Sequence, residues 1–250
     1  MTAAAMVRVR GLAIGWGEVT LLRDVSFDVR RGDVFAVLGG SGCGKSTLLR
    51  NVIGLEEPQA GEVDVGGRGR PNLAVGRPAF GVMFQAGALF GSMTVVENVA
   101  LPLRQWSDLP EPAVMAVARA TLGLVGLKGA EAKYPSEISG GMKKRAAIAR
   151  ALVLEPELIF LDEPSAGLDP VSADALDELI LALNAGLGLT VVLVTHELPS
   201  IFKIVKRCIM LDKEAKGVIA EGDPRELRDE SDDPRVRRFF HRKADEGGAS

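Results

Sequence analysis

A glycine-rich loop between an apolar run and a helical run constrains this chain more than any other feature. The apolar run, residues 33–38, is short and β-branched, as expected for a strand buried on both faces. A helix is predicted from Lys45 to about Ile53. The loop fits the pattern Gly-x-x-x-x-Gly-Lys-Ser/Thr and comprises Gly39, Gly40, Ser41, Gly42, Cys43, Gly44, Lys45, Ser46 and Thr47. This order of strand, loop and helix predicts a phosphate-binding loop.

The residue types in the loop suit that chemistry. Glycines let backbone N–H groups converge on phosphate oxygens, and the helix amino terminus adds the positive end of its dipole. Lys45 is expected to reach the β- and γ-phosphates, and the Ser46 hydroxyl to ligate Mg²⁺. A plain glycine-rich turn is the alternative, but it does not explain Lys-Ser at this offset. Cys43 is interpreted as a tolerated small side chain in preference to a redox switch.

A second motif is an apolar strand that ends in two acids. Residues 158–161 are all apolar, and Asp162 and Glu163 follow directly. The carboxyl end of such a strand opens on the crevice where ligands bind. Asp162 is expected to hold Mg²⁺ through its waters, and Glu163 to orient and deprotonate an attacking water. Many strands end in acids, so this interpretation depends on the phosphate-binding loop.

The third motif is Ser139-Gly140-Gly141, which opens a helix predicted over residues 142–154. It provides a second helix amino terminus suited to phosphate, although the same three residues would serve as an ordinary helix cap. Its place in the chain favours the functional interpretation. Between Ser139 and Asp162 there is room for one helix that leads into the acid-bearing strand.

Composition and patterning describe the rest of the chain. With 250 residues and a net charge of −3, the chain has no general attraction for nucleic acid. The basic run of residues 143–145 is expected on the solvated face of a helix. Cys43 and Cys208 are expected to be reduced thiols. No signal peptide is expected, and no segment reaches the length that a membrane span needs.

The order of the predicted elements indicates an α/β fold. Short strands are expected in the first thirty residues, and small antiparallel strands with loops over residues 56–79. Helices dominate from residue 86 to about residue 155, after which strands and helices alternate again. The pattern predicts a mostly parallel α/β core interrupted by a helical insertion.

These three motifs, in this order and spacing, resemble the ABC ATPase family over about residues 6–228. The resemblance implies a P-loop NTPase core of the RecA-like kind, an antiparallel β subdomain, an inserted helical subdomain over about 86–155, and a tail over 229–250. It implies ATP as ligand with Mg²⁺. It further assigns Gln85 to the Q-loop and the metal, Asp169 to the D-loop, His196 to the switch histidine, and Trp16 to stacking on adenine.

The family also implies a mechanism. Two copies of the chain pack head to tail, so that the loop of one and the Ser139 motif of the other enclose the nucleotide. The usual signature is Leu-Ser-Gly-Gly-Gln, whereas this chain has Ile138 and Met142 at its ends. Met142 removes any contact that a glutamine would make, but Ser139 and the glycine backbone remain. Activity is expected to survive.

Within the family, four segments resemble the ATPases of bacterial Mla- and Mce-type lipid transporters: residues 84–90, 92–103, 141–147 and 233–236. This likeness implies a place on the cytoplasmic face of the inner membrane, as a peripheral subunit. It implies a membrane permease, an MCE-type substrate-binding protein and a small STAS-domain protein as partners. The alternatives are an osmoprotectant importer and a soluble ABC ATPase without a transporter. An unrelated P-loop kinase is disfavoured by the Ser139 motif.

Two surface features complete the expectations. Val236, Phe239 and Phe240 are spaced for one face of a short helix, which is expected to dock on the neighbouring subunit. The alternatives are docking on the same subunit, docking on a partner protein, and a disordered tail. Residues 86–88 are small enough to admit a helix of the permease, and the alternative is that they pack internally within the helical insertion. Gly87→Trp is therefore expected to disturb the partner contact with little loss of stability.

Overall fold

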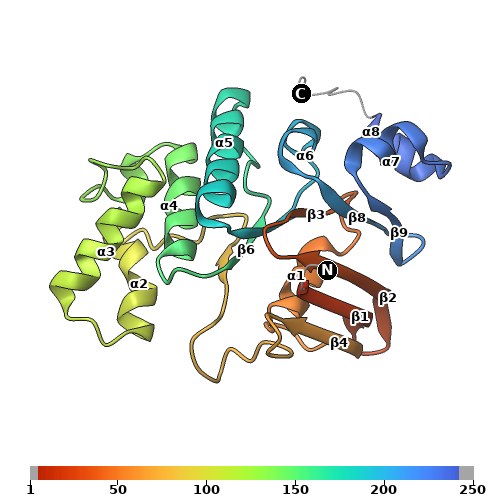
Figure 1. Cartoon of the computed structure of the whole chain (residues 1–250), viewed down its shortest axis with the longest axis horizontal. Helices are drawn as coiled ribbons and strands as arrows, with labels where there is room; N and C mark the ends of the chain where they lie inside the picture. Colours follow the sequence, from red (N-terminus) through yellow and green to blue (C-terminus); the bar gives the residue numbers. More distant parts are fainter. Residues whose placement is uncertain (1–4, 242–250) are drawn as a thin grey trace.

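Two sheets organise the part of the chain that the computed structural model describes, residues 5–241. One is a three-stranded antiparallel sheet of order β2-β1-β4, and the other is a six-stranded sheet of order β5-β6-β7-β3-β8-β9 (Figure 1). The strands are β1 (Ala5–Trp16), β2 (Val19–Arg30), β3 (Val34–Gly39), β4 (Ala60–Val65), β5 (Gly81–Met83), β6 (Leu158–Asp162), β7 (Thr190–Val194), β8 (Arg207–Asp212) and β9 (Gly217–Gly222).

The helices lie around and beside these sheets. They are α1 (Lys45–Val52), α2 (Val95–Trp106), α3 (Glu111–Leu124), α4 (Gly140–Leu152), α5 (Pro170–Leu187), α6 (Leu198–Ile204), α7 (Pro224–Glu230) and α8 (Pro234–Phe240), with a 3₁₀ turn at Pro135–Glu137. Pro102 lies inside α2, and Thr94 caps that helix in a capping box with Glu97. Within residues 5–241, no helix is both long and apolar enough to cross a membrane.

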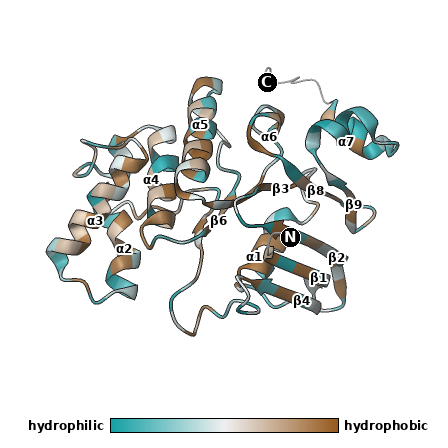
Figure 2. Cartoon of the chain, viewed as in Figure 1, coloured by the Kyte–Doolittle hydropathy of each residue, from teal (hydrophilic) through white to brown (hydrophobic). Residues whose placement is uncertain are grey.

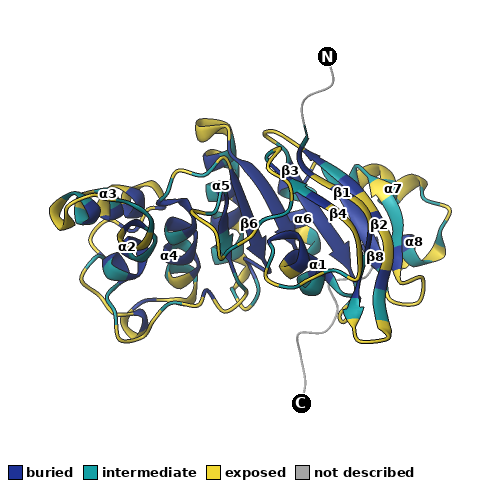
Figure 3. Cartoon of the chain, turned by 90° about the horizontal axis from the view of Figure 1, so that it is seen from below, coloured by how far each residue is buried: buried dark blue, intermediate teal, exposed yellow. Residues whose placement is uncertain are grey.

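The six-stranded sheet is buried on both faces because its central strands are apolar throughout. β3, β6 and β7 are wholly buried (Figure 3), and the five strands from β5 to β8 run parallel, with β9 antiparallel to β8. Alternate residues of β3 enter different clusters: Ala36 packs with the helices, and Phe35 packs with α1 and the antiparallel sheet. Figure 2 shows this apolar interior, in contrast to the hydrophilic α7. A continuous apolar run is typical of such doubly covered strands.

The helices α2, α3 and α4 form a separate group at one end of the molecule, between β5 and β6 in sequence (Figure 1). Their apolar faces join the same cluster as α5 and α6, so they are packed onto the sheet. The fold class expected from the sequence, an α/β core with an antiparallel sheet and inserted helices, is confirmed.

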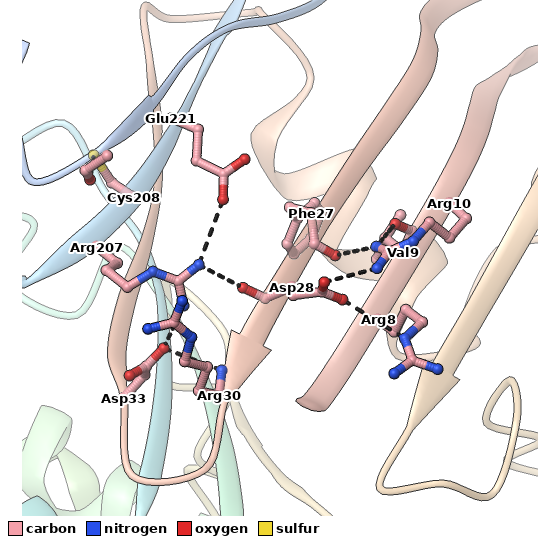
Figure 4. Close-up of polar contacts among 11 residues, drawn as sticks. Arg8, Val9, Arg10, Phe27, Asp28, Arg30, Asp33, Arg207, Cys208 and Glu221 are labelled. Atoms are coloured by element: carbon pink, nitrogen blue, oxygen red, sulfur yellow. Dashed lines mark hydrogen bonds and ion pairs between the residues drawn. The ribbon is translucent and has the colours of Figure 1, made fainter. Parts of the chain in front are cut away.

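A cluster of charged side chains ties the two sheets together (Figure 4). Arg207 on β8 donates to Asp33 Oδ2 at 2.8 Å and to the Asp28 carbonyl oxygen at 3.3 Å, and it also pairs with Glu221 at 3.4 Å. Asp28 on β2 in turn accepts from Arg10 Nη2 at 2.7 Å on β1. The guanidinium group thus connects the last turn before β3 to both sheets.

The tail helix α8 docks on its own chain. Val236, Phe239 and Phe240 are all buried, and the Phe240 ring lies 5.7 Å from the ring of Phe202 on α6. The apolar face was expected to dock on the neighbouring subunit, and this expectation was wrong. A partly buried ring on α6 covers the same apolar area within one chain, at no cost in association entropy. Residues 242–250 lie outside the described part of the chain.

Phe240→Ala should therefore destabilise the single chain. Loss of this buried ring is expected to lower the free energy of unfolding by about 3 kcal/mol, because the packing against Phe202 is lost. Urea denaturation measures the change, and Arg238→Ala on the exposed face of the same helix is the matched control. Equal stability of the two variants would contradict intramolecular docking.

Candidate functional site

The ends of four parallel strands bring the candidate residues to one edge of the sheet. β3 runs into the glycine-rich loop, β6 ends at Asp162, and β7 leads to His196. Gln85 lies in the turn that follows β5. Because parallel strands end at the same edge, segments far apart in the sequence meet there.

The backbone of the loop requires glycine at several positions. A Cβ on Gly39 would lie 2.5 Å from the Leu211 carbonyl oxygen, and the φ of Gly39 is +146°. Gly42 and Gly44 have φ values of +73° and +100°, which side-chain-bearing residues rarely adopt. Gly44 is also the amino-terminal cap residue of α1. The loop can therefore wrap closely while its N–H groups point toward one place.

The ammonium group of Lys45 is held by backbone carbonyl groups of the loop. The Lys45 ammonium donates to the carbonyl oxygens of Gly39 at 2.9 Å and Gly40 at 3.0 Å. Phosphate oxygens would be stronger, charged acceptors for the same donor.

Cys43, in the same loop, is 2% exposed, and burial raises the pKa of its thiol. A protonated, enclosed thiol supports the interpretation of Cys43 as a packing residue.

Ser46 and Asp162, which were each expected to bind Mg²⁺, lie in contact. Ser46 Oγ donates to Asp162 Oδ1 at 3.1 Å, although the two residues come from α1 and β6. Burial raises the pKa of Asp162, and the Ser46 hydrogen bond partly offsets this effect. Hydroxyl and carboxylate oxygens are the hard ligands that Mg²⁺ takes, so the pair fits this ion. Among residues 5–241 no group of three or more His, Cys, Asp or Glu could hold a metal alone.

Glu163 is the most constrained residue of the site. Its φ of +47° is unusual for a residue other than glycine, and its N–H donates to the Val194 carbonyl oxygen at 2.8 Å. Glu163 Oε1 lies 2.7 Å from His196 Nδ1. Glu163 Oε2 is buried without a hydrogen-bond partner among the described residues. A strained backbone that holds a buried, half-satisfied carboxylate suits a group that acts on a small polar molecule such as water.

The basic run after the Ser139 motif is not a solvated face, which corrects the sequence interpretation. Lys143 is exposed, but Lys144 is only 8% exposed, and its Nζ donates to the Gln85 carbonyl oxygen at 2.6 Å. Arg145 donates to the carbonyl oxygens of Val125 and Ala175 at 3.1 and 3.0 Å. Helical periodicity in the sequence could have indicated the burial of Lys144, because this residue shares its helix face with the buried residues Ala147, Ile148 and Ala151.

Gly87 also differs from the sequence expectation. It is buried with a φ of +70°, and a Cβ there would lie 3.6 Å from Ala147 Cβ. Arg150 holds this turn by donating to the Gly87 and Ala88 carbonyl oxygens at 2.8 and 2.7 Å. Gly87→Trp would therefore strain the fold itself, so the expectation of little lost stability was wrong.

Three further candidate groups come from other elements of the chain. Ser139 Oγ accepts from the Met142 N–H at 3.3 Å and caps α4, which lies across β6 from α1 (Figures 1 and 3). Trp16 is 58% exposed at the end of β1. Asp169 caps α5, and hydrogen bonds from Ser172 lower the pKa of its carboxyl group. A single chain thus presents the Ser139 motif away from its own phosphate-binding loop.

A glycine-rich loop, a lysine and a strand-end acid at one edge of a parallel sheet define a P-loop nucleotide-binding protein. Residues 22–166 match the ABC transporter family. The chain is 40% identical to the intermembrane phospholipid transport system ATP-binding protein MlaF of Escherichia coli, over 98% of this chain and 91% of that protein. It is 41% identical to the probable ribonucleotide transport ATP-binding protein mkl of Mycobacterium leprae, over 96% of this chain and 70% of that protein.

The chain belongs to the ABC transporter family, as an ATP-binding and ATP-hydrolysing subunit. Solved structures agree with this assignment. The dimeric ATP-binding cassette MJ0796 bound to ADP and Pi has a TM-score of 0.77 at 29% identity, covering 87% of this chain and 98% of that chain. The cbiO1 subunit of Clostridium perfringens has a TM-score of 0.80 at 29% identity, covering 90% and 91%.

Glu163→Gln should leave ATP binding intact and lower the rate of hydrolysis by about 100-fold or more, because an amide cannot accept the proton of the attacking water. Steady-state phosphate release and nucleotide titration measure the two properties. Glu157→Gln removes the same charge from the exposed residue just before the opposite end of β6 and is the control. A normal rate in Glu163→Gln would exclude this residue as the base.

Proposed function

We propose that this chain powers the movement of phospholipids by an ABC transporter at a bacterial inner membrane. The similarity to MlaF carries the proposal, because it extends over 98% of this chain and 91% of that protein. The mkl protein is named for ribonucleotide transport and is as similar in sequence, but the chain spans only 70% of its length. Ribonucleotide transport is therefore the second candidate.

In the proposed site, ATP lies on the glycine-rich loop with its β- and γ-phosphates against Lys45. Ser46, Asp162 and Gln85 would hold Mg²⁺, which would neutralise phosphate charge when bound. The contact between Ser46 and Asp162 supports the first two assignments. The exposed ring of Trp16 supports its role in stacking on adenine.

Glu163 and His196 act on the attacking water. Glu163 Oε2, which has no hydrogen-bond partner among residues 5–241, accepts the water proton as the water oxygen forms a bond to the γ-phosphorus. The bond from that phosphorus to the bridging oxygen breaks, and ADP and phosphate leave. His196 holds the other carboxylate oxygen at 2.7 Å, so the carboxylate keeps its orientation during the step.

Two copies of the chain complete the site by packing head to tail. Ser139, Gly140 and Gly141 of one copy cover the nucleotide on the loop of the other, and the segment of residues 165–169, including Asp169, lies at the contact. The exposure of Ser139 and Gly140 at the start of α4 supports this arrangement. The dimeric state of the related cassette MJ0796 supports it as well.

Mixing two inactive variants tests the head-to-tail arrangement. Lys45→Ala removes the phosphate-binding charge, and Ser139→Arg blocks the motif that faces the partner's nucleotide. A mixed dimer keeps one intact composite site, so an equal mixture should recover up to about a quarter of the wild-type rate when chains pair at random. Differential tags verify that mixed dimers form. Activity no higher than that of either variant alone, in the presence of mixed dimers, would contradict the arrangement.

An apolar groove supports a membrane permease as partner. A cavity of about 290 Å³ lies between β5, α2 and α4, and its lining includes Leu55, Phe80, Phe84 and Trp106. Leu55 is 49% exposed, which is costly for an isolated apolar side chain in water. We propose that a short cytoplasmic helix of the permease occupies this groove. The chain then lies on the cytoplasmic face of the membrane, with an MCE-type substrate-binding protein and a STAS-domain protein in the same assembly.

Recovery of the tagged chain from membranes tests this proposal. A polytopic protein should be recovered with the wild-type chain, whereas Leu55→Glu, which places a charge in the groove, should lower its yield by about 10-fold. The purified complex in vesicles should move a fluorescent phospholipid with ATP, and the Glu163→Gln complex should not. Glu157→Gln serves as the active control. ATP-dependent ribonucleotide uptake without lipid movement would favour the second candidate.

A further inference from the structure

Lys144 is a buried cation in the middle of α4, and it lies between two motifs of the site. Its Nζ donates to the Gln85 carbonyl oxygen at 2.6 Å and to the Glu163 carbonyl oxygen at 3.2 Å. The residue is only 8% exposed. An ammonium group is costly to bury unless it is hydrogen bonded or paired, so these two contacts compensate the burial.

Charge surrounds this ammonium group as well. Burial lowers the pKa of Lys144, whereas the negative charges of Glu163 and Asp162 raise it and so oppose that effect. The bridging cation therefore stands behind the acids of the site, on the side of the helical segment. Within the described part of the chain its hydrogen bonds go to backbone oxygens, so it acts on Glu163 through the position of the main chain.

Both carbonyl groups belong to residues whose direction matters for hydrolysis. Gln85 begins the turn after β5, and Glu163 has the left-handed backbone that aims its carboxylate toward His196. Ser139 caps the same helix five residues before Lys144, about one and a half turns away. Lys144 thus joins the helix of the Ser139 motif to the backbone of Gln85 and of Glu163.

We propose that Lys144 is a positioning residue that links the Ser139 helix to Gln85 and Glu163, so that hydrolysis depends on the placement of α4. The inference rests on the proposed roles of Gln85 and Glu163 in hydrolysis. Lys144 does not touch the nucleotide in this mechanism. It sets the relative positions of the two residues that do the chemistry.

Arg150 provides a comparison within the same helix. Among the described residues its hydrogen bonds go to the carbonyl oxygens of Gly87 and Ala88, so it holds the turn after Gln85 and is not hydrogen bonded to Glu163. Burial partly desolvates both cations and so lowers the pKa of each. A variant of Arg150 thus loosens the turn alone, whereas a variant of Lys144 also separates it from Glu163.

The test compares the ATPase kinetics of the full-length chain with those of single and double variants. Lys144→Met keeps the aliphatic stem and removes the ammonium group. We expect kcat to fall by about 10-fold or more with KM changed less than about twofold, since a positioning role acts on the chemical step. Lys144→Arg keeps a cation and should retain kcat within about threefold. Lys213→Met, at an exposed lysine in the turn after β8, should match the wild type.

A double-mutant cycle separates positioning from general support of the fold. If Lys144 acts through Gln85, Lys144→Met should lower kcat by a smaller factor in a Gln85→Ala background than in the wild type. Arg150→Met should lower kcat by a smaller factor than Lys144→Met. Independent, multiplying effects of Lys144→Met and Gln85→Ala would overturn the proposal, as would an unchanged kcat in Lys144→Met.

Stability is measured alongside, because removal of a buried cation from α4 also changes packing. If Lys144→Met does not fold, Lys144→Arg becomes the variant that tests the proposal. A kcat lowered by about 10-fold or more in a folded Lys144→Arg would overturn it. Glu163→Gln is assayed in the same series. Normal hydrolysis in Glu163→Gln would refute the proposed catalytic role itself, whereas loss there with a normal Lys144→Met would refute the positioning role only.

Discussion

The register of three parallel strands fixes the site on which everything else depends. Val194 of β7 pairs with Asp162 of β6 on one side and with Val37 of β3 on the other. Beyond these pairs, β6 leads to Glu163, β7 leads to His196, and β3 leads to the glycine-rich loop. All three therefore lie at one edge of the sheet. A shift of one residue in any pair would turn these side chains to the other face. The wholly buried, apolar strands resist such a shift, because slipping would expose or misplace their packing.

The same edge concentrates unfavourable local features that the surrounding fold offsets. Glu163 has a left-handed backbone and a buried oxygen without a hydrogen-bond partner in the described part of the chain, and Asp162 is a buried acid whose pKa is raised. Behind them, Lys144 is a buried cation. Opposite charges that are desolvated together stabilise one another more than they would in water. Contacts between the sheet and α4 therefore offset the unfavourable free energy of the strained backbone and of the buried charged groups.

The sequence predicted the local parts of this arrangement and missed the parts that depend on tertiary packing. The loop from Gly39 to Thr47 and the acids after β6 could be found because strand, loop and helix are contiguous. Lys144 was missed because a run of basic residues indicates solvation unless the helical face is counted. The α8 helix was found from the spacing of Val236, Phe239 and Phe240, but an apolar face does not specify which surface covers it. For Gly87, residue size alone did not reveal a positive φ.

One helix connects the two surfaces where partners are proposed to bind. The first turn of α4 carries Ser139 and faces outward, where the second copy would meet it. Lys144, in the same helix, reaches the backbone of Gln85 and Glu163, and Arg150 holds the following turn while lining the apolar groove beside β5. Because a helix is stiff over this length, displacement of its first turn moves both cations. A nucleotide bound across the dimer would thus alter the groove and the carboxylate proposed to activate water together, which is the coupling that a transporter requires.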